Sequence, residues 1–555
     1  MRFWRFLRYN NNGAAPDVIM NMEACMKQYV VTASEMKRYD NNTIEKYRIP
    51  ALLLMERAAL VTVEELQNMR GKQPCKVLVM AGCGNNGGDG LAIGRLLMLQ
   101  GYDVTCILLG NEGKCTEETA RQICILREYG VRIFSTIQDA EYDIVIDAIF
   151  GVGLSRTVEG ISLEAIKWMN DSKAYVCSID IPSGVRADTG EMMGCAVRAD
   201  LTVTYGFHKL GHILYPGAGC VGRLVCRQMG IDEHSFLGVE PYWYTHTGPD
   251  AGLLPVRRPD GNKGTFGKVL VIAGNREIAG AALLAAKSTL RMGAGMVKVV
   301  TAAQNKDALL QYVPEAMVLT YPDKMQYENG DSSAGEAEFT KRLKESETWA
   351  DCILIGPGIG TDRRAYDLLR FAIEESSLPL IIDADGINLM AQDVNLQDSV
   401  VKCGEQGRTV ILTPHMGEFA RLYGCTTLQA KEHMTEYTLR LCDKMKCILV
   451  CKDARTVVVW HGGEHGYINT TGNAGMATAG SGDVLAGMIA GLVAQRMSGA
   501  DAAVTGVYLH GTAGDLAAEH ETETSMVAAD IIDRIGDAIL LQQRERGQGE
   551  TEIKV

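Results

Sequence analysis

Residues 473–487 combine glycines with an aspartate in a pattern that could bind a phosphate group and act on it. Three glycines lead directly into an apolar run at residues 484–493, which predicts a buried helix. The unpaired amides and the dipole at the amino end of such a helix favour an anion. Asp483 would repel that anion, but it could take the proton of a hydroxyl group that attacks a phosphoryl group. The alternative is a plain glycine turn in which Asp483 is the N-cap of the helix.

Four earlier strand-like runs of the second half also end in residues that can bind ligands. They end near Gly358, at Asp383 and Asp385, at His415 and Glu418, and at Lys452, Asp453 and Arg455. The carboxyl ends of parallel strands meet at one edge of a sheet, so these loops can form the walls of one site with Asp483. For Asp383 and Asp385 two roles stay open, as a helix cap and as a buried hydrogen-bond acceptor.

The first half shows the same alternation of strands and glycine loops. A strand at residues 76–81, a loop at 82–90, a helix at 91–100 and a strand at 104–109 form a βαβ unit. Asp147 lies inside an apolar run, and Asp180 ends another one. Because charged residues rarely stay unpaired in such runs, the two aspartates indicate a ligand site at the strand ends. The alternative is that both aspartates cap helices.

Composition and charge narrow the class of protein. The chain has 555 residues, enough for roughly two to four domains. With 68 acidic and 55 basic residues its net charge is −13, which argues against a dedicated nucleic-acid surface. The 16 cysteines are scattered and form no CxxC pair, so we expect reduced thiols in a cytoplasmic protein. The apolar runs are shorter than the ~20 residues that a membrane span needs.

Three motifs of the first half occur in an order that is typical of one family. NNGGDG, DAIFGVGL and DIPSGV follow one another, and over about residues 31–232 the chain resembles the epimerase domain of NAD(P)H-hydrate repair proteins. The resemblance implies potassium ligands at Asn86, Asp147 and Ser183, and hard oxygen donors of this kind suit an alkali cation. It makes Asp180 a candidate acid–base residue. The implied substrate contacts are Asn85, Asn86, Gly87, Gly88, Asp89, Gly151, Val152, Gly153, Leu154, Ser155, Arg156, Thr157 and Asp180.

The second half resembles the ribokinase-like superfamily and, within it, the NAD(P)H-hydrate dehydratases. The resemblance covers about residues 250–545 and depends on GPGIG, LTPHMGE, KDART and NAGMATAGSGDVLAG taken together. The implied substrate contacts are Ala281, Gly358, His415 and Asp483. The implied contacts to an adenine nucleotide are Lys452, Asp453, Ala454, Arg455, Thr456 and Gly482.

This resemblance also implies a reaction. A nucleotide, which we expect to be ADP rather than ATP, phosphorylates the ring hydroxyl of hydrated NADH or NADPH, and phosphate then leaves more readily than hydroxide. Asp483 would take the hydroxyl proton, and Mg²⁺ would neutralise the nucleotide phosphates. The dehydratase would accept the S isomer of the hydrate, and the epimerase would interconvert the two isomers.

We therefore expect an α/β protein of two domains, an N-terminal Rossmann-like α/β/α sandwich and a C-terminal ribokinase-like α/β/α domain. The expected organisation is a leader at 1–30 that is disordered or untranslated, an epimerase domain at 31–240, a linker at 241–260, a dehydratase domain at 261–545 and a tail at 546–555. A capping box at Thr32 and Glu35 opens a helix expected over residues 32–66. We expect a cytoplasmic homo-oligomer whose partners are the hydrated cofactor and an adenine nucleotide, without nucleic acid or membrane.

Two alternatives belong to other functional classes. One is a kinase for a small molecule such as a vitamin or sugar, because the nucleotide-site residues do not exclude it. The other makes the first domain a module that only binds a ligand or serves as a scaffold.

Overall fold

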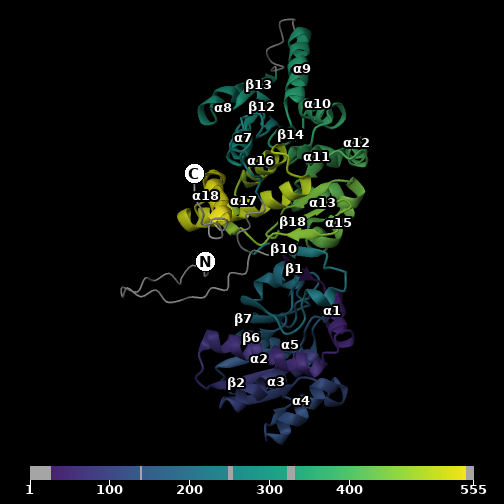
Figure 1. The fold of residues 1–555 in the computed structure, drawn as a ribbon, viewed down its shortest axis with the longest axis vertical. Coiled ribbons are helices and arrows are strands. Elements are labelled where there is room, and N and C mark those ends of the chain that lie inside the picture. Colours follow the sequence, from purple (N-terminus) through teal and green to yellow (C-terminus); the bar gives the residue numbers. More distant parts are fainter. Residues whose placement is uncertain (1–26, 138–139, 248–253, 322–331, 545–555) are drawn as a thin grey trace, which may run out of the picture.

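The computed structural model describes residues 27–137, 140–247, 254–321 and 332–544. Two α/β units lie one above the other along the longest axis, with the first half of the chain below and the second half above (Figure 1). The predicted tail, most of the predicted leader and residues 248–253 of the predicted linker lie outside the described residues.

The first unit is built on a seven-stranded sheet in the order β4-β3-β2-β5-β6-β7-β9, in which every neighbouring pair is parallel. Its strands are β2 (Lys76–Ala81), β3 (Asp103–Leu108), β4 (Ile133–Phe134), β5 (Ile144–Ala148), β6 (Tyr175–Ile179), β7 (Leu201–Tyr205) and β9 (Arg223–Arg227). Its helices are α1 (Ala33–Glu45), α2 (Ala51–Arg70), α3 (Asn85–Leu99), α4 (Glu117–Glu128), α5 (Gly160–Asp171) and α6 (Leu210–Ile213). Val77 and Val79 of β2 pack with residues of α2, α3 and α4, while Leu78 and Met80 pack with α5. Burial on both faces explains why the strand is apolar from Val77 to Ala81.

The second unit is built on a twelve-stranded sheet in the order β13-β12-β11-β14-β15-β16-β17-β18-β19-β10-β1-β8. Its strands are β10 (Trp243–Thr245), β11 (Lys268–Ile272), β12 (Met296–Ala302), β13 (Met317–Tyr321), β14 (Cys352–Ile355), β15 (Leu380–Ile382), β16 (Val410–Leu412), β17 (Ile448–Cys451), β18 (Val457–Trp460) and β19 (Gly466–Ile468), joined by β1 (Gln28–Val31) and β8 (His208–Lys209). The helices are α7 (Gly280–Arg291), α8 (Lys306–Tyr312), α9 (Ser332–Trp349), α10 (Arg363–Arg370), α11 (Asp385–Gln392), α12 (Val394–Glu405), α13 (Met416–Tyr423), α14 (Thr427–Glu432), α15 (Met434–Met445), α16 (Ser481–Ala494), α17 (Gly499–Glu521) and α18 (Ala528–Arg544). Helices α7, α16, α17 and α18 share one core with the sheet, and α10 to α15 share the other. The predicted α/β fold with two domains is confirmed.

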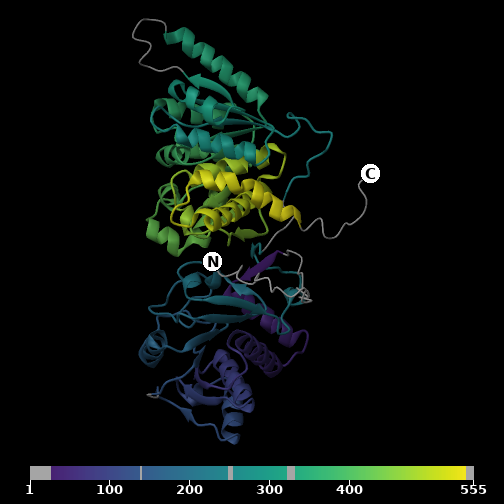
Figure 2. The same cartoon turned by 90° about the vertical axis from the view of Figure 1, so that its left-hand side faces the viewer.

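The twelve-stranded sheet crosses from one half of the chain to the other. Strand β10, which lies in the expected linker, pairs in parallel with β19 and antiparallel with β1. β1 in turn pairs with β8 of the first half. Val30, Leu210, Ile213 and Leu214 belong to the same apolar core as Leu449 of the second half. Figures 1 and 2 show β1 and neighbouring segments of the first half at the junction of the two units.

Two predicted elements differ from the structure. The helix expected over residues 32–66 is two helices, α1 and α2, because Pro50 precedes α2 and keeps the chain extended there. The capping box at Thr32 and Glu35 is confirmed. Helix α3 begins at Asn85 rather than at residue 91, so most of the predicted glycine loop forms its first turns. Packing of this end on β2 and α2 outweighs the low helix propensity of glycine.

Helix α16 is apolar on all sides and packs on the sheet with α7 and α17 as its neighbours. Its N-cap is Gly480, whose φ of 89° favours glycine. A Cβ at Gly487 would lie 2.4 Å from the Ala285 carbonyl oxygen, so only glycine allows α7 to approach this closely. None of the described helices is long and apolar enough to span a membrane.

Candidate active sites

Asp483 lies in the first turn of α16, at the edge of the sheet where four strands end. It is the third residue of the helix and Gly480 is the N-cap, so the alternative in which Asp483 is the N-cap is wrong. No side chain caps this helix end. The first amides of α16 are therefore not taken by a capping side chain and can serve an anion.

Three neighbouring strands of the sheet bring polar side chains to this helix end. Asp383, Thr413 and Lys452 directly follow β15, β16 and β17. Asp383 Oδ1 accepts hydrogen bonds from Lys452 Nζ at 2.8 Å and from Thr413 Oγ1 at 2.7 Å. A Cβ at Gly482 would lie 3.1 Å from Lys452 Nζ, so the ammonium group lies against the amino end of α16.

The charges around Asp483 favour its protonated form. Burial and the negative charge of Asp383 raise its pKa to about 7, although the ammonium of Lys452 opposes them. Burial would lower the pKa of Lys452, but Asp383 and Glu418 outweigh it and the pKa is raised. Asp483 can thus gain and lose a proton near neutral pH beside a permanent positive charge, as a general base requires.

The other predicted substrate contacts lie around the same edge. Ala281 and Gly358 are neighbours, since a Cβ at Gly358 would lie 2.9 Å from that of Ala281. His415 is the N-cap of α13 and forms a β-bridge with Lys452. The carboxylate of Glu418 accepts a hydrogen bond from the backbone amide of His415 at 2.9 Å. The structure therefore brings Ala281, Gly358, His415 and Asp483 to one end of the sheet.

Of the two roles left open for Asp383 and Asp385, only that of a buried acceptor is confirmed, because the N-cap of α11 is Ala384 and no side chain caps this helix. Asp383 is a buried acceptor, as described above. Asp385 begins α11 and accepts a hydrogen bond from the amide of Gly360 at 2.8 Å, which holds the GPGIG loop against the site.

The predicted nucleotide contacts at residues 452–456 point in different directions. Asp453 and Ala454 are exposed. Arg455 turns to the first half, where Nε donates to the Ile213 carbonyl oxygen at 3.2 Å and the guanidinium lies over the ring of Tyr215. Lys452 is thus the member of this group that lies beside Asp483 and Gly482.

A second site lies at the carboxyl ends of β5 and β6 in the first unit. Asp147 Oδ2 accepts hydrogen bonds from Ser178 Oγ at 2.7 Å and from the Ser183 amide at 2.8 Å. Ser183 Oγ accepts one from the Phe150 amide at 2.9 Å, and Asn86 lies against Gly151. The structure therefore gathers Asn86, Asp147 and Ser183 around the turn after β5.

Asp147 and Asn86 carry groups that fit a bound cation. Asp147 is completely buried, and the hydrogen bonds to it come from neutral donors. A buried charge is costly without an opposite charge. The side-chain nitrogen of Asn86 is buried without a hydrogen-bond partner in the described part of the chain. Turning that amide over would present its oxygen instead of its nitrogen.

Asp180 lies beside this group and is held by a lysine. Lys209 Nζ is completely buried and donates to Asp180 Oδ1 at 2.6 Å and to Thr204 Oγ1 at 2.7 Å. His212 Nδ1 accepts from the Lys209 amide, so its Nε2 carries the proton and donates to the Asp180 carbonyl at 2.8 Å. Asp180 has φ 63°, a strained conformation for a residue other than glycine.

The charge of Asp180 also acts on two more carboxyl groups, those of Asp89 and Asp40. Burial and the charges of Asp180 and Asp40 raise the pKa of Asp89 well above its usual range. Burial and Asp180 also raise the pKa of Asp40. Because neighbouring carboxylates do not all ionise together, the site can hold an acid and a base at the same pH.

The predicted substrate contacts at residues 151–157 differ in how far their side chains are exposed to solvent. Ser155, Arg156 and Thr157 are exposed and free to meet a ligand, whereas the side chain of Leu154 is buried in the core with α5. Val152 packs on the cluster of Ile181 and Val185, which keeps this loop beside Ser183.

Lys209 and Asp40 are the residues of this site that the sequence reading missed. Lys209 lies in β8, a two-residue strand without a periodic pattern, and Asp40 lies on the mostly polar helix α1. Asp180, directly after the buried strand β6, predicts a basic partner, although the sequence does not show which residue it is.

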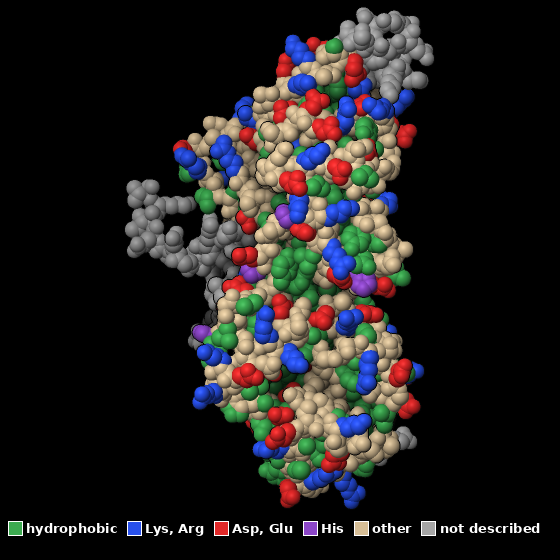
Figure 3. Space-filling model, turned by 90° about the vertical axis from the view of Figure 1, so that its right-hand side faces the viewer, with side chains coloured by type: hydrophobic (Ala, Val, Ile, Leu, Met, Phe, Trp, Pro, Cys, Tyr) green, Lys and Arg blue, Asp and Glu red, His purple; other side chains and the backbone are tan. Residues whose placement is uncertain are grey.

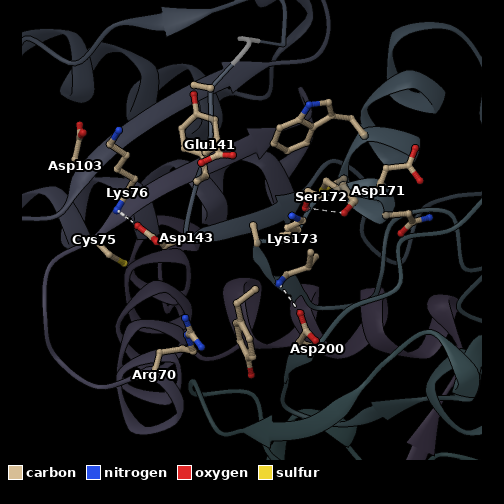
Figure 4. A pocket seen from close by; sticks show the side chains of 18 of the residues that line it. Arg70, Cys75, Lys76, Asp103, Glu141, Asp143, Asp171, Ser172, Lys173 and Asp200 are labelled. Atoms are coloured by element: carbon tan, nitrogen blue, oxygen red, sulfur yellow. Dashed lines mark hydrogen bonds between the residues drawn. The ribbon is translucent and has the colours of Figure 1, made fainter.

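A broad surface hollow lies at the opposite end of the first sheet (Figure 4). Its carboxylates serve the strands: Asp143 accepts from the Lys76 amide, and Asp200 accepts from the Val176 amide, both at 2.9 Å. Parallel sheets bind ligands at their carboxyl ends, so we do not place a site in this hollow. On the face shown in Figure 3, acidic and basic side chains alternate without a continuous basic patch.

Two family profiles match the chain in the order of its two units. The profile described as NAD(P)H-hydrate dehydratase matches residues 269–536, and that of the YjeF-related protein N-terminus matches residues 51–211. Together with the fold, they define a two-domain α/β enzyme with one candidate site in each domain.

Relatives that contain both domains match nearly the whole chain. The bifunctional NAD(P)H-hydrate repair enzyme Nnr of Moorella thermoacetica is 35% identical over 520 residues, which cover 91% of this chain and 95% of the relative. The enzyme of the same name from Escherichia coli is 32% identical over 458 residues, covering 82% and 83%. The solved ADP/ATP-dependent NAD(P)H-hydrate dehydratase from Bacillus subtilis is 26% identical with a TM-score of 0.42, and the match covers 53% of this chain and 98% of that chain. This chain belongs to the family of bifunctional NAD(P)H-hydrate repair enzymes, which confirms the resemblance predicted from the motifs of both halves.

Proposed function

We propose that the chain repairs hydrated NADH and NADPH at two separate sites in the cytoplasm. The site at Asp180 interconverts the two isomers of the hydrate, and the site at Asp483 converts the S isomer to NADH or NADPH at the expense of ADP. The observation that carries the proposal is the position of Asp483 and Lys452 at the uncapped amino end of α16. A base, a cation and free amides meet there, as phosphoryl transfer to a hydroxyl requires.

In the dehydratase reaction, Asp483 takes the proton of the ring hydroxyl. The hydroxyl oxygen then bonds to the terminal phosphorus of ADP, and AMP leaves with the electron pair of the broken bond. Lys452 and the amides of α16 stabilise the negative charge on the transferring group. In the second step the carbon–oxygen bond breaks, phosphate takes the electron pair, and the ring loses a proton to restore its double bond.

Magnesium fits this site as an ion carried by the nucleotide. Asp385 and Glu418 provide the oxygen donors that Mg²⁺ prefers, and Mg²⁺ usually binds through phosphates with only one or two carboxylates. Bound there, the ion would neutralise the phosphate charge. In the described part of the chain, no group of three or more His, Cys, Asp or Glu side chains could hold a metal ion.

In the first site we assign the proton transfers of epimerisation to Asp180, with Lys209 holding its carboxylate in place. Lys209 Nζ donates to Asp180 at 2.6 Å, while burial and the charge of Asp180 raise the pKa of Asp89 and of Asp40. A carboxyl group with a raised pKa can serve as the acid beside a second carboxyl group that serves as the base.

A direct assay tests the function. The full chain is mixed with hydrated NADH and ADP, and recovery of the NADH absorbance is followed. No recovery would reject the dehydratase, and transfer of phosphate to a vitamin or sugar instead would support the kinase. For epimerisation, the full chain without nucleotide should speed equilibration of separated isomers; the spontaneous rate would favour a scaffold. The full chain is needed because residues 31–240 alone lack β10 and all of β1 except Val31, and these two strands pair with each other.

The rate of dehydration should depend on pH through Asp483. A base must be ionised to accept a proton, and the pKa of Asp483 is raised to about 7. We expect kcat to reach a plateau above this pH and to fall about tenfold per pH unit well below it. Stopped assays with purified S hydrate at constant ionic strength measure this fall of kcat at acid pH. A kcat that stays constant down to pH 5 would contradict the assignment.

Potassium should bind at Asn86, Asp147 and Ser183. Replacing K⁺ by tetramethylammonium, which is too large for such a site, leaves the buried charge of Asp147 uncompensated. We expect epimerisation to slow by about tenfold or more and the melting temperature of the full chain to fall, with KCl reversing both effects. Asn86→Ala should weaken the response to KCl. Identical melting temperatures in both salts would contradict the site.

A further inference from the structure

The carboxylate of Asp383 orders two side chains from neighbouring strands. Its side chain is 1% exposed, and that of Lys452 is 18% exposed. One oxygen, Oδ1, accepts both the hydroxyl of Thr413 and the ammonium of Lys452. A lysine side chain is flexible and its ammonium is a point charge, so it keeps one position only when a partner fixes it.

The fixed position of Lys452 is next to the amino end of α16. The ammonium lies beside Gly482, at 3.1 Å from where a Cβ would be, and therefore beside the residue that precedes Asp483. This is where the proposed phosphoryl group would meet the amides of the helix. Without Asp383 the ammonium could turn toward Glu418 or Asp483, whose charges also act on it.

Neither stability nor nucleotide binding explains a buried carboxylate here. A buried ion pair contributes little net stability, because both charges lose their hydration. The negative charge of Asp383 also repels the phosphates of a nucleotide. The negative charge of Asp383 therefore disfavours nucleotide binding, and we expect its benefit to lie in the chemical step.

We propose that Asp383 is a positioning residue of the dehydratase reaction, which holds the ammonium of Lys452 beside Gly482 for the transferring phosphoryl group. The proposal rests on the proposed dehydratase function. Asp383 also acts on the base: the charged groups that act on Asp483 are Asp383, Asp385 and Glu418, which oppose its ionisation, and Lys452, which favours it.

The test is Asp383→Asn in the full chain. We expect kcat for dehydration to fall by about tenfold or more, because a misplaced catalytic group typically costs that much. The KM for ADP should not rise, since the variant removes a repulsive charge. The acid limb of kcat should move to lower pH by about one unit, because Asp483 loses its strongest negative neighbour.

Asp351→Asn is the matched control. Asp351 also accepts a hydrogen bond from a neighbouring strand, at 2.9 Å from the Lys268 amide, but it lies at the opposite end of the strands. Asp351→Asn should leave kcat and the pH at which kcat falls unchanged. A melting temperature and an epimerisation rate near those of the wild type show that Asp383→Asn is folded.

A double-mutant cycle separates positioning from an independent effect. If Asp383 acts through Lys452, then Asp383→Asn should change kcat by less than about twofold in a Lys452→Met background. The proposal would be overturned if the two substitutions reduced kcat independently, so that the loss in the double variant equals the product of the two single losses. It would also be overturned if Asp383→Asn alone left kcat unchanged and raised the KM for ADP. A wild-type chain that restores no NADH would instead reject the dehydratase function, and the positioning role with it.

Discussion

Asp483→Asn is expected to abolish dehydration of hydrated NADH, with a loss in kcat of about a thousandfold or more, while epimerisation continues at the wild-type rate. The amide keeps the shape of the carboxylate but cannot take the hydroxyl proton. The first site lies in the other half of the chain, around the ends of β5 and β6, and does not include this residue. Recovery of NADH absorbance measures the first activity, and chromatography of the two hydrate isomers measures the second.

Asp501→Asn provides the control for Asp483→Asn. Asp501 is the third residue of α17, as Asp483 is the third residue of α16, but it is exposed. Its replacement should leave both activities intact. Loss of both activities in Asp483→Asn, with an unchanged melting temperature, would argue against two independent sites.

Lys209→Met is expected to slow epimerisation by about a hundredfold, while dehydration of purified S hydrate continues. Methionine keeps much of the apolar stem but removes the ammonium that Asp180 accepts at 2.6 Å. The carboxylate then loses the partner that fixes its orientation, and proton transfer typically contributes at least this factor.

Lys76→Met is the control for Lys209→Met, because Lys76 is exposed and lies at the opposite end of the seven-stranded sheet from Asp180. It should epimerise normally. If Lys209→Met also epimerises normally, the ion pair is structural and Asp180 needs no lysine for its chemistry.

The sequence predicts those parts of the sites that follow a buried strand. Uninterrupted apolar runs such as those of β2 and β5 can be recognised as buried strands, so the positions of Asp147, Asp180, Asp383 and Lys452 in or directly after such runs could be derived. The resemblance added which of these residues act together.

Residues whose role depends on distant partners could not be predicted. Lys209 is buried because Asp180, from another part of the chain, balances its charge. Two partners of Arg455, Ile213 and Tyr215, lie in the other half of the chain, and the KDART motif alone suggests only a nucleotide contact. Strands β1, β8 and β10 have two to four residues each, too few for a periodic pattern.

The sheet shared by the two halves also sets an order of folding. β1 and β10 can pair once residue 245 has been synthesised, but the other edge of β10 has no partner until β19, which ends at Ile468. An unpaired edge can join another chain. During the synthesis of more than two hundred residues, this edge is therefore exposed to misassembly, and the last third of the chain closes it.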